Sequence, residues 1–317
     1  MNLTWARLTI RLSRFELLAF GGFIVLFIVG TVVTAAWIDT LRPPAECLAN
    51  VETHPLSCEA KGAAWYAAQN GITGLSVGLT IFLSFAAGIF LGVPIVAREV
   101  ERGTSRLAWS LTPSRMRWFL SRLLPILVVL VAVTFVAGVA ADRWFAAVSP
   151  NDDPANSFNQ FGFRGLLVAS RSVFIFAVAV AVGAIVARAL PAVILTAVIA
   201  TVGLAGGERV HQMILASEAV AIPLDFTSNG PTGGDHPGDL YIDQKFVLPD
   251  GSMVDYSYFN GQDPYDANGM PKYPMVALVV PGERYRFVET REALALAGGS
   301  FAALILAGFV VSRRRPG

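Results

Sequence analysis

Residues 74–78, Gly-Leu-Ser-Val-Gly, match the G-x-S-x-G pattern in which a serine acts as a nucleophile. That pattern requires a strand-to-helix turn with a base within reach, whereas this copy lies inside a long apolar run, residues 72–97. All three histidines, His54, His211 and His236, lie in polar segments outside such runs. The sequence therefore predicts no serine catalysis at Ser76.

The lysines and the acidic residues do not form a recognisable nucleotide or metal site either. A P-loop needs G-x-x-x-x-G-K-[ST], and none of the three lysines completes it. Glu208 and His211 lie one helical turn apart, and His236, Asp239 and Asp243 form a loose acidic cluster. Neither group offers three or four ligands at a recognised spacing. We therefore expect no cofactor and no metal in this chain, and no catalytic residue.

The composition is that of a membrane protein. Of the 317 residues, 54 % are hydrophobic and only 15 % are charged, and the mean hydropathy is +0.57. A helix of about 20 apolar residues crosses a bilayer, and the apolar runs lack the alternation of barrel strands. We predict an all-α polytopic membrane protein with six transmembrane helices, at residues 17–38, 72–97, 123–141, 165–186, 191–207 and 293–311.

Charge is strongly separated between the segments that join these helices. Residues 1–16, 98–122, 187–190 and 312–317 together carry 13 arginines and 3 acidic residues. The alternate segments carry 10 basic and 20 acidic residues. Because Lys and Arg in short loops mark the cytoplasmic side, we expect both termini in the cytoplasm of a cell whose plasma membrane the chain spans several times.

The amino-terminal segment, residues 1–16, alternates apolar and basic positions with a helical period. Trp5, Leu8, Leu12 and Phe15 share one face, and the arginines follow the same period on another. This pattern is typical of an amphipathic helix lying in the inner membrane interface. A plain basic flank that only orients the first span is the alternative.

Cys47 and Cys58 both lie in the first outer loop. An oxidising compartment favours a disulfide between them, and closing so short a loop contributes about 2–3 kcal/mol in the chain-entropy model. Two free thiols are the alternative.

The long segment at residues 208–292 is predicted to form a small extracytoplasmic cap. Residues 245–259 read as a hairpin around Pro-Asp-Gly, and residues 275–288 read as a second one. Residues 208–221 look helical, and residues 229–238 look like an irregular loop. The predicted organisation is an interfacial helix, five membrane helices, the cap, and a sixth helix with a basic tail, at residues 1–16, 17–207, 208–292 and 293–317.

A stripe of small residues runs along the second span. Ser76, Thr80, Ser84, Gly88 and Gly92 recur every four residues. Such a face suits close helix packing, and it equally suits the lining of a transport pathway. The sequence does not choose between the two.

Arg171 is the only full charge well inside a predicted span. A desolvated guanidinium needs a partner or water, so it faces the bundle interior or a cavity, or snorkels to the outer interface. A place on the substrate path is a further alternative.

The most informative segment is the elbow, which we define as residues 98–122. It carries six arginines and two glutamates, and its helical pattern breaks at Gly103-Thr104 and Thr112-Pro113. Ser114 can cap the helix that follows. A soluble partner could bind a compact, charged elbow of this kind and move it as a rigid body. A basic loop that meets only lipid headgroups is the alternative.

The elbow resembles the signature of ABC-2 type permeases. The matching letters are Glu99 and Glu101, then Gly103-Thr104, then residues 111–115, Leu-Thr-Pro-Ser-Arg, and entry into the third span at residues 118–123. Six spans with both ends inside and a large outer insertion before the last span also match. Trp109 stands where the family usually has an aliphatic residue, and the cap is long for the family.

The resemblance implies the membrane subunit of an ATP-binding cassette exporter. Such a permease works as a homodimer or heterodimer with separate ATPase subunits, which bind the ATP and Mg. The implied residues for coupling to the ATPase are Glu99, Glu101, Arg102, Gly103, Thr104, Arg106 and Arg115. The substrate class stays open among drugs, lipids and peptides. A membrane sensor or anchoring subunit with a ligand-binding cap is the principal alternative, and a secondary transporter is a weaker one.

Overall fold

The protein is described here by a computed structural model that covers residues 14–44, 56–104, 114–150, 152–227, 230–232, 238–260, 263–266 and 270–314. The chain divides into two compact units. The helical unit comprises residues 1–150, 162–204 and 289–317. The sheet unit comprises residues 151–161 and 205–288. Most of the predicted interfacial helix, together with Cys47 and Arg106, lies outside the described residues.

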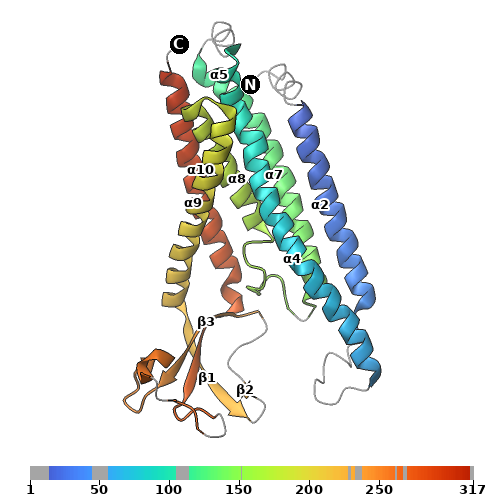
Figure 1. The fold of residues 1–317 in the computed structure, drawn as a ribbon, viewed down its shortest axis with the longest axis vertical. Coiled ribbons are helices and arrows are strands. Elements are labelled where there is room, and N and C mark those ends of the chain that lie inside the picture. The colour runs from blue at the N-terminus through green and yellow to red at the C-terminus, as the bar shows by residue number, and fades with distance from the viewer. Residues whose placement is uncertain are drawn as a thin grey trace. The chain divides into compact units, whose positions relative to one another are not determined.

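Six of the described helices are long and apolar enough to cross a membrane, as predicted (Figure 1). All of them except α8 extend beyond their predicted spans, because polar turns continue the helix past the apolar core. The helices are α2 (Arg14–Leu41), α4 (Leu56–Val93), α7 (Arg115–Val148), α8 (Leu166–Val186), α9 (Ala189–Glu218) and α10 (Tyr285–Arg313). Buried Cys58 lies near the start of α4, so the predicted first outer loop is shorter than expected. Its pairing with Cys47 stays a prediction.

Helix α8 is the centre of the helical unit, and α4 packs along it. Small residues allow this close approach, because a Cβ atom added at Gly88 or Gly92 would lie within 2.3 or 2.7 Å of an α8 side chain. Ser172 of α8 donates a hydrogen bond to Ser84 of α4, with 3.3 Å between the hydroxyl oxygens. The second half of the small-residue stripe is therefore a helix-packing face.

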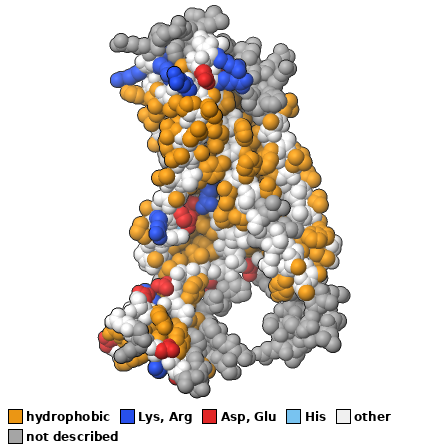
Figure 2. Space-filling model, in the orientation of Figure 1, with side chains coloured by type: hydrophobic (Ala, Val, Ile, Leu, Met, Phe, Trp, Pro, Cys, Tyr) orange, Lys and Arg blue, Asp and Glu red, His pale blue; other side chains and the backbone are white. Residues whose placement is uncertain are grey.

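The outer surface of the helical unit is apolar. Figure 2 shows hydrophobic side chains spread over the long helices, with Lys and Arg gathered at the end that carries α5 (Glu99–Glu101). Helices α2, α9 and α10 leave large side chains exposed, among them Leu26, Leu190 and Phe301. Because water does not favour so much exposed apolar surface, this surface is the lipid-facing side of a membrane protein.

The sheet unit is built on a five-stranded antiparallel sheet with strand order β2-β1-β5-β3-β4. The strands are β1 (Val220–Thr227), β2 (Gly230–Thr232), β3 (Leu240–Val247), β4 (Met253–Val254) and β5 (Met275–Val280). The loop expected at residues 229–238 thus contains a short strand. The helix expected at residues 208–221 is the continuation of α9, which ends at Glu218.

The hairpin expected at residues 245–259 corresponds to β3 and β4, although the second strand is short. Its turn uses Gly251 at φ +82°, a conformation that glycine adopts without strain. The Ser252 hydroxyl and backbone N–H both donate to Asp250 and hold the pKa of that carboxyl below its usual range.

The second expected hairpin, residues 275–288, does not form. Only β5 is a strand there, and α10 begins at Tyr285. Tyr285 and Val288 are three residues apart, so both face the same side of the helix. They join the buried cluster that includes Phe158, Leu215 and Val280, and burial on a helical period outweighs their strand propensity.

The packing of α4 on α8 predicts different effects for two glycines of α4. Gly92→Leu should lower the free energy of unfolding by about 1–3 kcal/mol through overpacking, because Gly92 lies against Ala179 and Phe176. Gly78→Leu is the control, since nothing lies within 4 Å of its Cβ position. Thermal unfolding in detergent measures both. Equal midpoints for the two variants would contradict the packing.

Candidate functional site

The elbow begins with a change of helix type. Helix α4 continues into a π-helical turn, η1 (Pro94–Arg98), and then into the short α5. Proline lacks the N–H that an α-helix needs at that position, so a wider turn accommodates it. Gly103 then adopts φ +70° and ends the helical path, a conformation that favours glycine. The sequence predicted the break at Gly103, whereas the π-helical turn was not predicted.

Glu99 contacts two other residues of the elbow through its carboxylate. Its Oε1 lies 2.7 Å from Nη1 of Arg122, which is on the second turn of α7. The Thr104 hydroxyl donates to Glu99 Oε2 over 2.8 Å. The Arg122 guanidinium also lies 5.2 Å from the centre of the Trp118 ring. The two helices on either side of the elbow are therefore held together by a charged, largely shielded contact.

Glu101 reaches a helix that lies far away in the sequence. Its Oε2 accepts a hydrogen bond from the backbone N–H of Ala189, the first residue of α9, over 2.9 Å. The first N–H groups of a helix have no partner within the helix and carry a partial positive charge. The carboxylate of Glu101 therefore caps α9.

Two arginines satisfy carbonyls at helix ends on the same side of the unit. Arg115 donates to the backbone oxygens of Ser312 and Arg314, at the end of α10. Arg314 donates to the carbonyl of Ala184, near the end of α8, over 2.6 Å. Ser114 accepts from Arg117 N and caps α7, as predicted from the sequence. These helix ends, which the charge pattern predicts on the cytoplasmic side, are thus joined by the side chains that cap them.

Arg102 differs from these residues. It is exposed beside the Gly103 turn, and within the described residues no ion pair involves its side chain. Of the residues predicted to couple to an ATPase, Glu99, Glu101, Thr104 and Arg115 are engaged inside the chain. Arg102 is the described one whose charge is available to a partner.

Hydroxyls of the small-residue stripe form hydrogen bonds within α4. Thr80 donates to the carbonyl of Ser76 over 2.9 Å, and Ser84 donates to that of Thr80 over 3.3 Å. Thr80 and Ser84 are buried, and Ser76 is half-buried. The hydroxyls of Thr80 and Ser84 thus form hydrogen bonds inside their own helix.

Arg171 has a partner that the sequence prediction missed. Its guanidinium lies 2.9 Å from the carboxylate of Glu292 on α10 and donates to the carbonyl of Gly162 over 3.0 Å. The centre of the Phe163 ring is 5.7 Å away. Glu292 was expected in the outer segment before the last span, but α10 begins earlier, at Tyr285. The Arg171 charge is therefore neutralised inside the helical unit.

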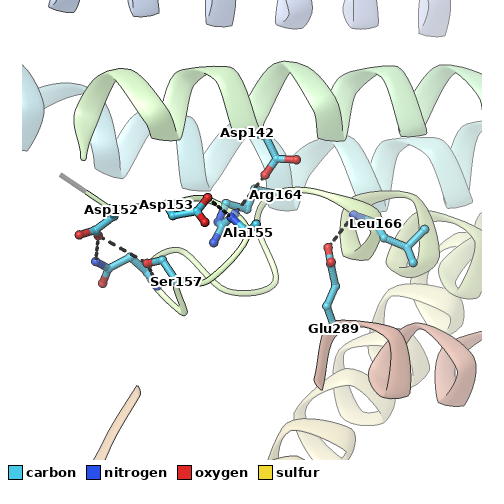
Figure 3. Close-up of polar contacts among 9 residues, drawn as sticks. Asp142, Asp152, Asp153, Ala155, Ser157, Arg164, Leu166 and Glu289 are labelled. Atoms are coloured by element: carbon cyan, nitrogen blue, oxygen red, sulfur yellow. Dashed lines mark hydrogen bonds and ion pairs between the residues drawn. The ribbon is translucent and has the colours of Figure 1, made fainter. Parts of the chain in front are cut away.

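A second set of charged contacts was also missed, and Figure 3 shows it. Arg164, almost fully buried, lies 3.1 Å from Asp142 of α7 and stacks over Phe145. Glu289 of α10, equally buried, accepts from the backbone N–H of Leu166, the first residue of α8, over 2.9 Å. Glu289 and Glu292 are three residues apart, so they lie on the same face of a helix. This spacing could have predicted that α10 begins before residue 293.

The described residues bring no three His, Cys, Asp or Glu side chains into a group that could hold a metal. In the described part of the elbow, the contacts are hydrogen bonds and ion pairs.

Six apolar helices, two of which are joined by a charged elbow, define a multi-pass membrane protein. Residues 20–208 match the family model described as ABC-2 membrane transporter related. No curated protein and no solved structure matches the chain.

The chain belongs to the ABC-2 membrane transporter related family, because the match covers more than half of its residues. The protein is a transport permease, a membrane component that is not itself catalytic. Membership implies association with ABC ATPase partners.

The Arg171 pair can be measured by a double-mutant cycle. Arg171→Met and Glu292→Gln should each lower the free energy of unfolding by about 2–3 kcal/mol, because each leaves a shielded charge without its partner. The double variant should lose at least about 1 kcal/mol less than the sum. Arg143→Met, an exposed arginine of α7, is the control and should have little effect. Strictly additive losses would show that the pair does not couple α8 to α10.

Proposed function

We propose that the chain is one membrane half of an ATP-driven exporter. Two such chains, identical or related, would form the transport path, and two separate ATPase subunits would bind ATP and Mg and supply the energy. The observation that carries the proposal is the elbow. Its described residues contact four long helices of the bundle, and an exposed arginine, Arg102, lies at its turn.

The proposed orientation places the elbow and both termini in the cytoplasm of the plasma membrane. Support comes from the arginines, since 13 of them fall in the segments on the elbow side. The sheet unit, which belongs to the acidic segments, would then lie outside the cell as an extracytoplasmic cap.

In the proposed cycle, ATP closes the paired ATPases, whose approach moves the two elbows. Each elbow moves the helix ends that it caps, and the bundles then favour an outward-open state until hydrolysis resets them. A shift from 1:99 to 99:1 requires ATP binding to favour that state by about 5.5 kcal/mol. Drug, lipid and peptide substrates are all compatible with this cycle.

Arg102 provides the test of the ATPase contact. Arg102→Glu should reduce copurification of the ATPase subunit at least about tenfold, since reversing one interfacial charge costs 1.4 kcal/mol or more. Arg188→Glu, an exposed arginine in the turn between α8 and α9, is the matched charge reversal outside the elbow. Pull-down at physiological salt measures both. If wild type brings down no ATPase, or if the two variants behave alike, the proposed docking is wrong.

A further inference from the structure

The sheet unit contains a cavity of about 680 Å³, a volume within the range of small-molecule sites in proteins. Three aromatic residues line it, together with one asparagine and two apolar residues. The six lining residues are Leu248, Pro249, Tyr258, Phe259, Asn260 and Tyr273. All of them belong to the sheet unit, so the cavity is formed within one compact unit of the chain.

The lining residues are positioned by elements of the sheet unit. Leu248 lies in the turn between β3 and β4, where its N–H and its carbonyl both form backbone hydrogen bonds. Phe259 ends the 3-10 helix η2 (Tyr256–Phe259), and its ring centre lies 5.1 Å from that of buried Phe246. Tyr273 comes two residues before β5. Packing and backbone contacts therefore hold the walls of the cavity in place.

The three lining rings stand at different angles. Tyr258 is at 89° to Phe259, with 5.6 Å between the ring centres. Tyr273 is at 29° to Phe259, with 5.4 Å between the centres. A cation is attracted to the face of an aromatic ring and does not need a flat contact surface. Rings at several angles therefore suit a compact, rounded cation.

Negative charge prevails in the sheet unit. Residues 151–161 and 205–288 carry 13 acidic and 5 basic side chains. Asp250 directly follows the lining residue Pro249, and hydrogen bonds from Ser252 lower the pKa of its carboxyl. This carboxylate is therefore ionised at neutral pH. An excess of negative charge raises the local concentration of cations.

Two lysines lie close in the chain to the lining residues, and each has partners. Lys245 forms ion pairs with Asp243 and Asp255, at 3.2 and 2.5 Å. The Lys272 ammonium donates to the carbonyl of Asp263 over 2.8 Å. None of the six residues that line the cavity is basic. The walls of the cavity therefore do not repel a cation.

We propose that this cavity binds a substituted ammonium group, whose charge lies against the rings of Tyr258 and Tyr273. Phe259 sets the angle between these two rings, and Asp250 adds a negative charge beside the site. Binding here needs neither ATP nor an ATPase partner. The proposal therefore goes beyond the exporter proposed above and does not depend on it.

Choline and 3,3-dimethylbutan-1-ol test the proposal, because the two molecules have nearly the same shape and only choline is charged. The full chain is titrated with each in phosphatidylethanolamine–phosphatidylglycerol nanodiscs at physiological salt. Saturation-transfer NMR, with empty nanodiscs as the blank, gives both dissociation constants. Wild type should bind choline at least about fivefold more tightly than the alcohol.

Three variants locate the site. Tyr258→Ala removes one ring and should weaken choline binding at least about fivefold. Its side chain is 58 % exposed, so the variant should fold. Tyr258→Phe keeps the ring face and should stay within about twofold of wild type. Tyr256→Ala is the matched control, because Tyr256 is equally exposed on the same 3-10 helix and does not line the cavity. It should leave choline binding unchanged.

Glycerophosphocholine identifies the source of the ammonium group, since it joins the same group to the phosphate of a lipid headgroup. Weaker binding than that of choline supports a free solute, as the acidic sheet unit favours. Tighter binding keeps the ammonium site and assigns it to a lipid headgroup.

Four results would overturn the proposal. The first is the absence of saturable choline binding above the blank. The second is equal affinity for choline and the alcohol, which would indicate a purely apolar cavity. The third is an equal effect of Tyr258→Ala and Tyr256→Ala. The fourth is displacement of choline by maltose, which would indicate a carbohydrate site.

Discussion

The structure depends on charged side chains that form hydrogen bonds with the unpaired backbone groups at the ends of helices. The first turn of a helix leaves backbone N–H groups without partners inside the helix, and the last turn leaves C=O groups. The carboxylates of Glu101 and Glu289 accept hydrogen bonds from the first N–H groups of α9 and α8. The guanidinium groups of Arg115 and Arg314 donate to the last carbonyls of α10 and α8. Each charge has the sign that the helix dipole favours.

These contacts explain how the described residues of the elbow accommodate a high density of charge. Six arginines in 25 residues would repel one another if all faced the solvent. Instead, Arg122 is neutralised by Glu99, and Arg115 is bound to the end of α10. The elbow is therefore both an arginine-rich loop and a structural junction between helices.

The sequence predicted what depends on local composition and left out what depends on distant pairing. Six spans, the Ser114 cap and the Gly103 break follow from short patterns, and the structure has all of them. The partner of Arg171 was missed because a hydropathy boundary stops at charged residues, and Glu292 is one of the residues at which it stopped. The Glu101 contact joins residues 88 positions apart, and no local pattern reports such a distance.

The free energy of a helix cap limits what a single contact can do in the permease. One carboxylate at an exposed helix start contributes about 0.3–1 kcal/mol, whereas a full population shift takes about 5.5 kcal/mol. No single cap can therefore hold or release a transport state. The change must be distributed over several helix ends, and the elbow contacts two of them, at the start of α9 and at the end of α10. A charge such as that of Arg102, whose side chain forms no ion pair within the described residues, can change without breaking these contacts.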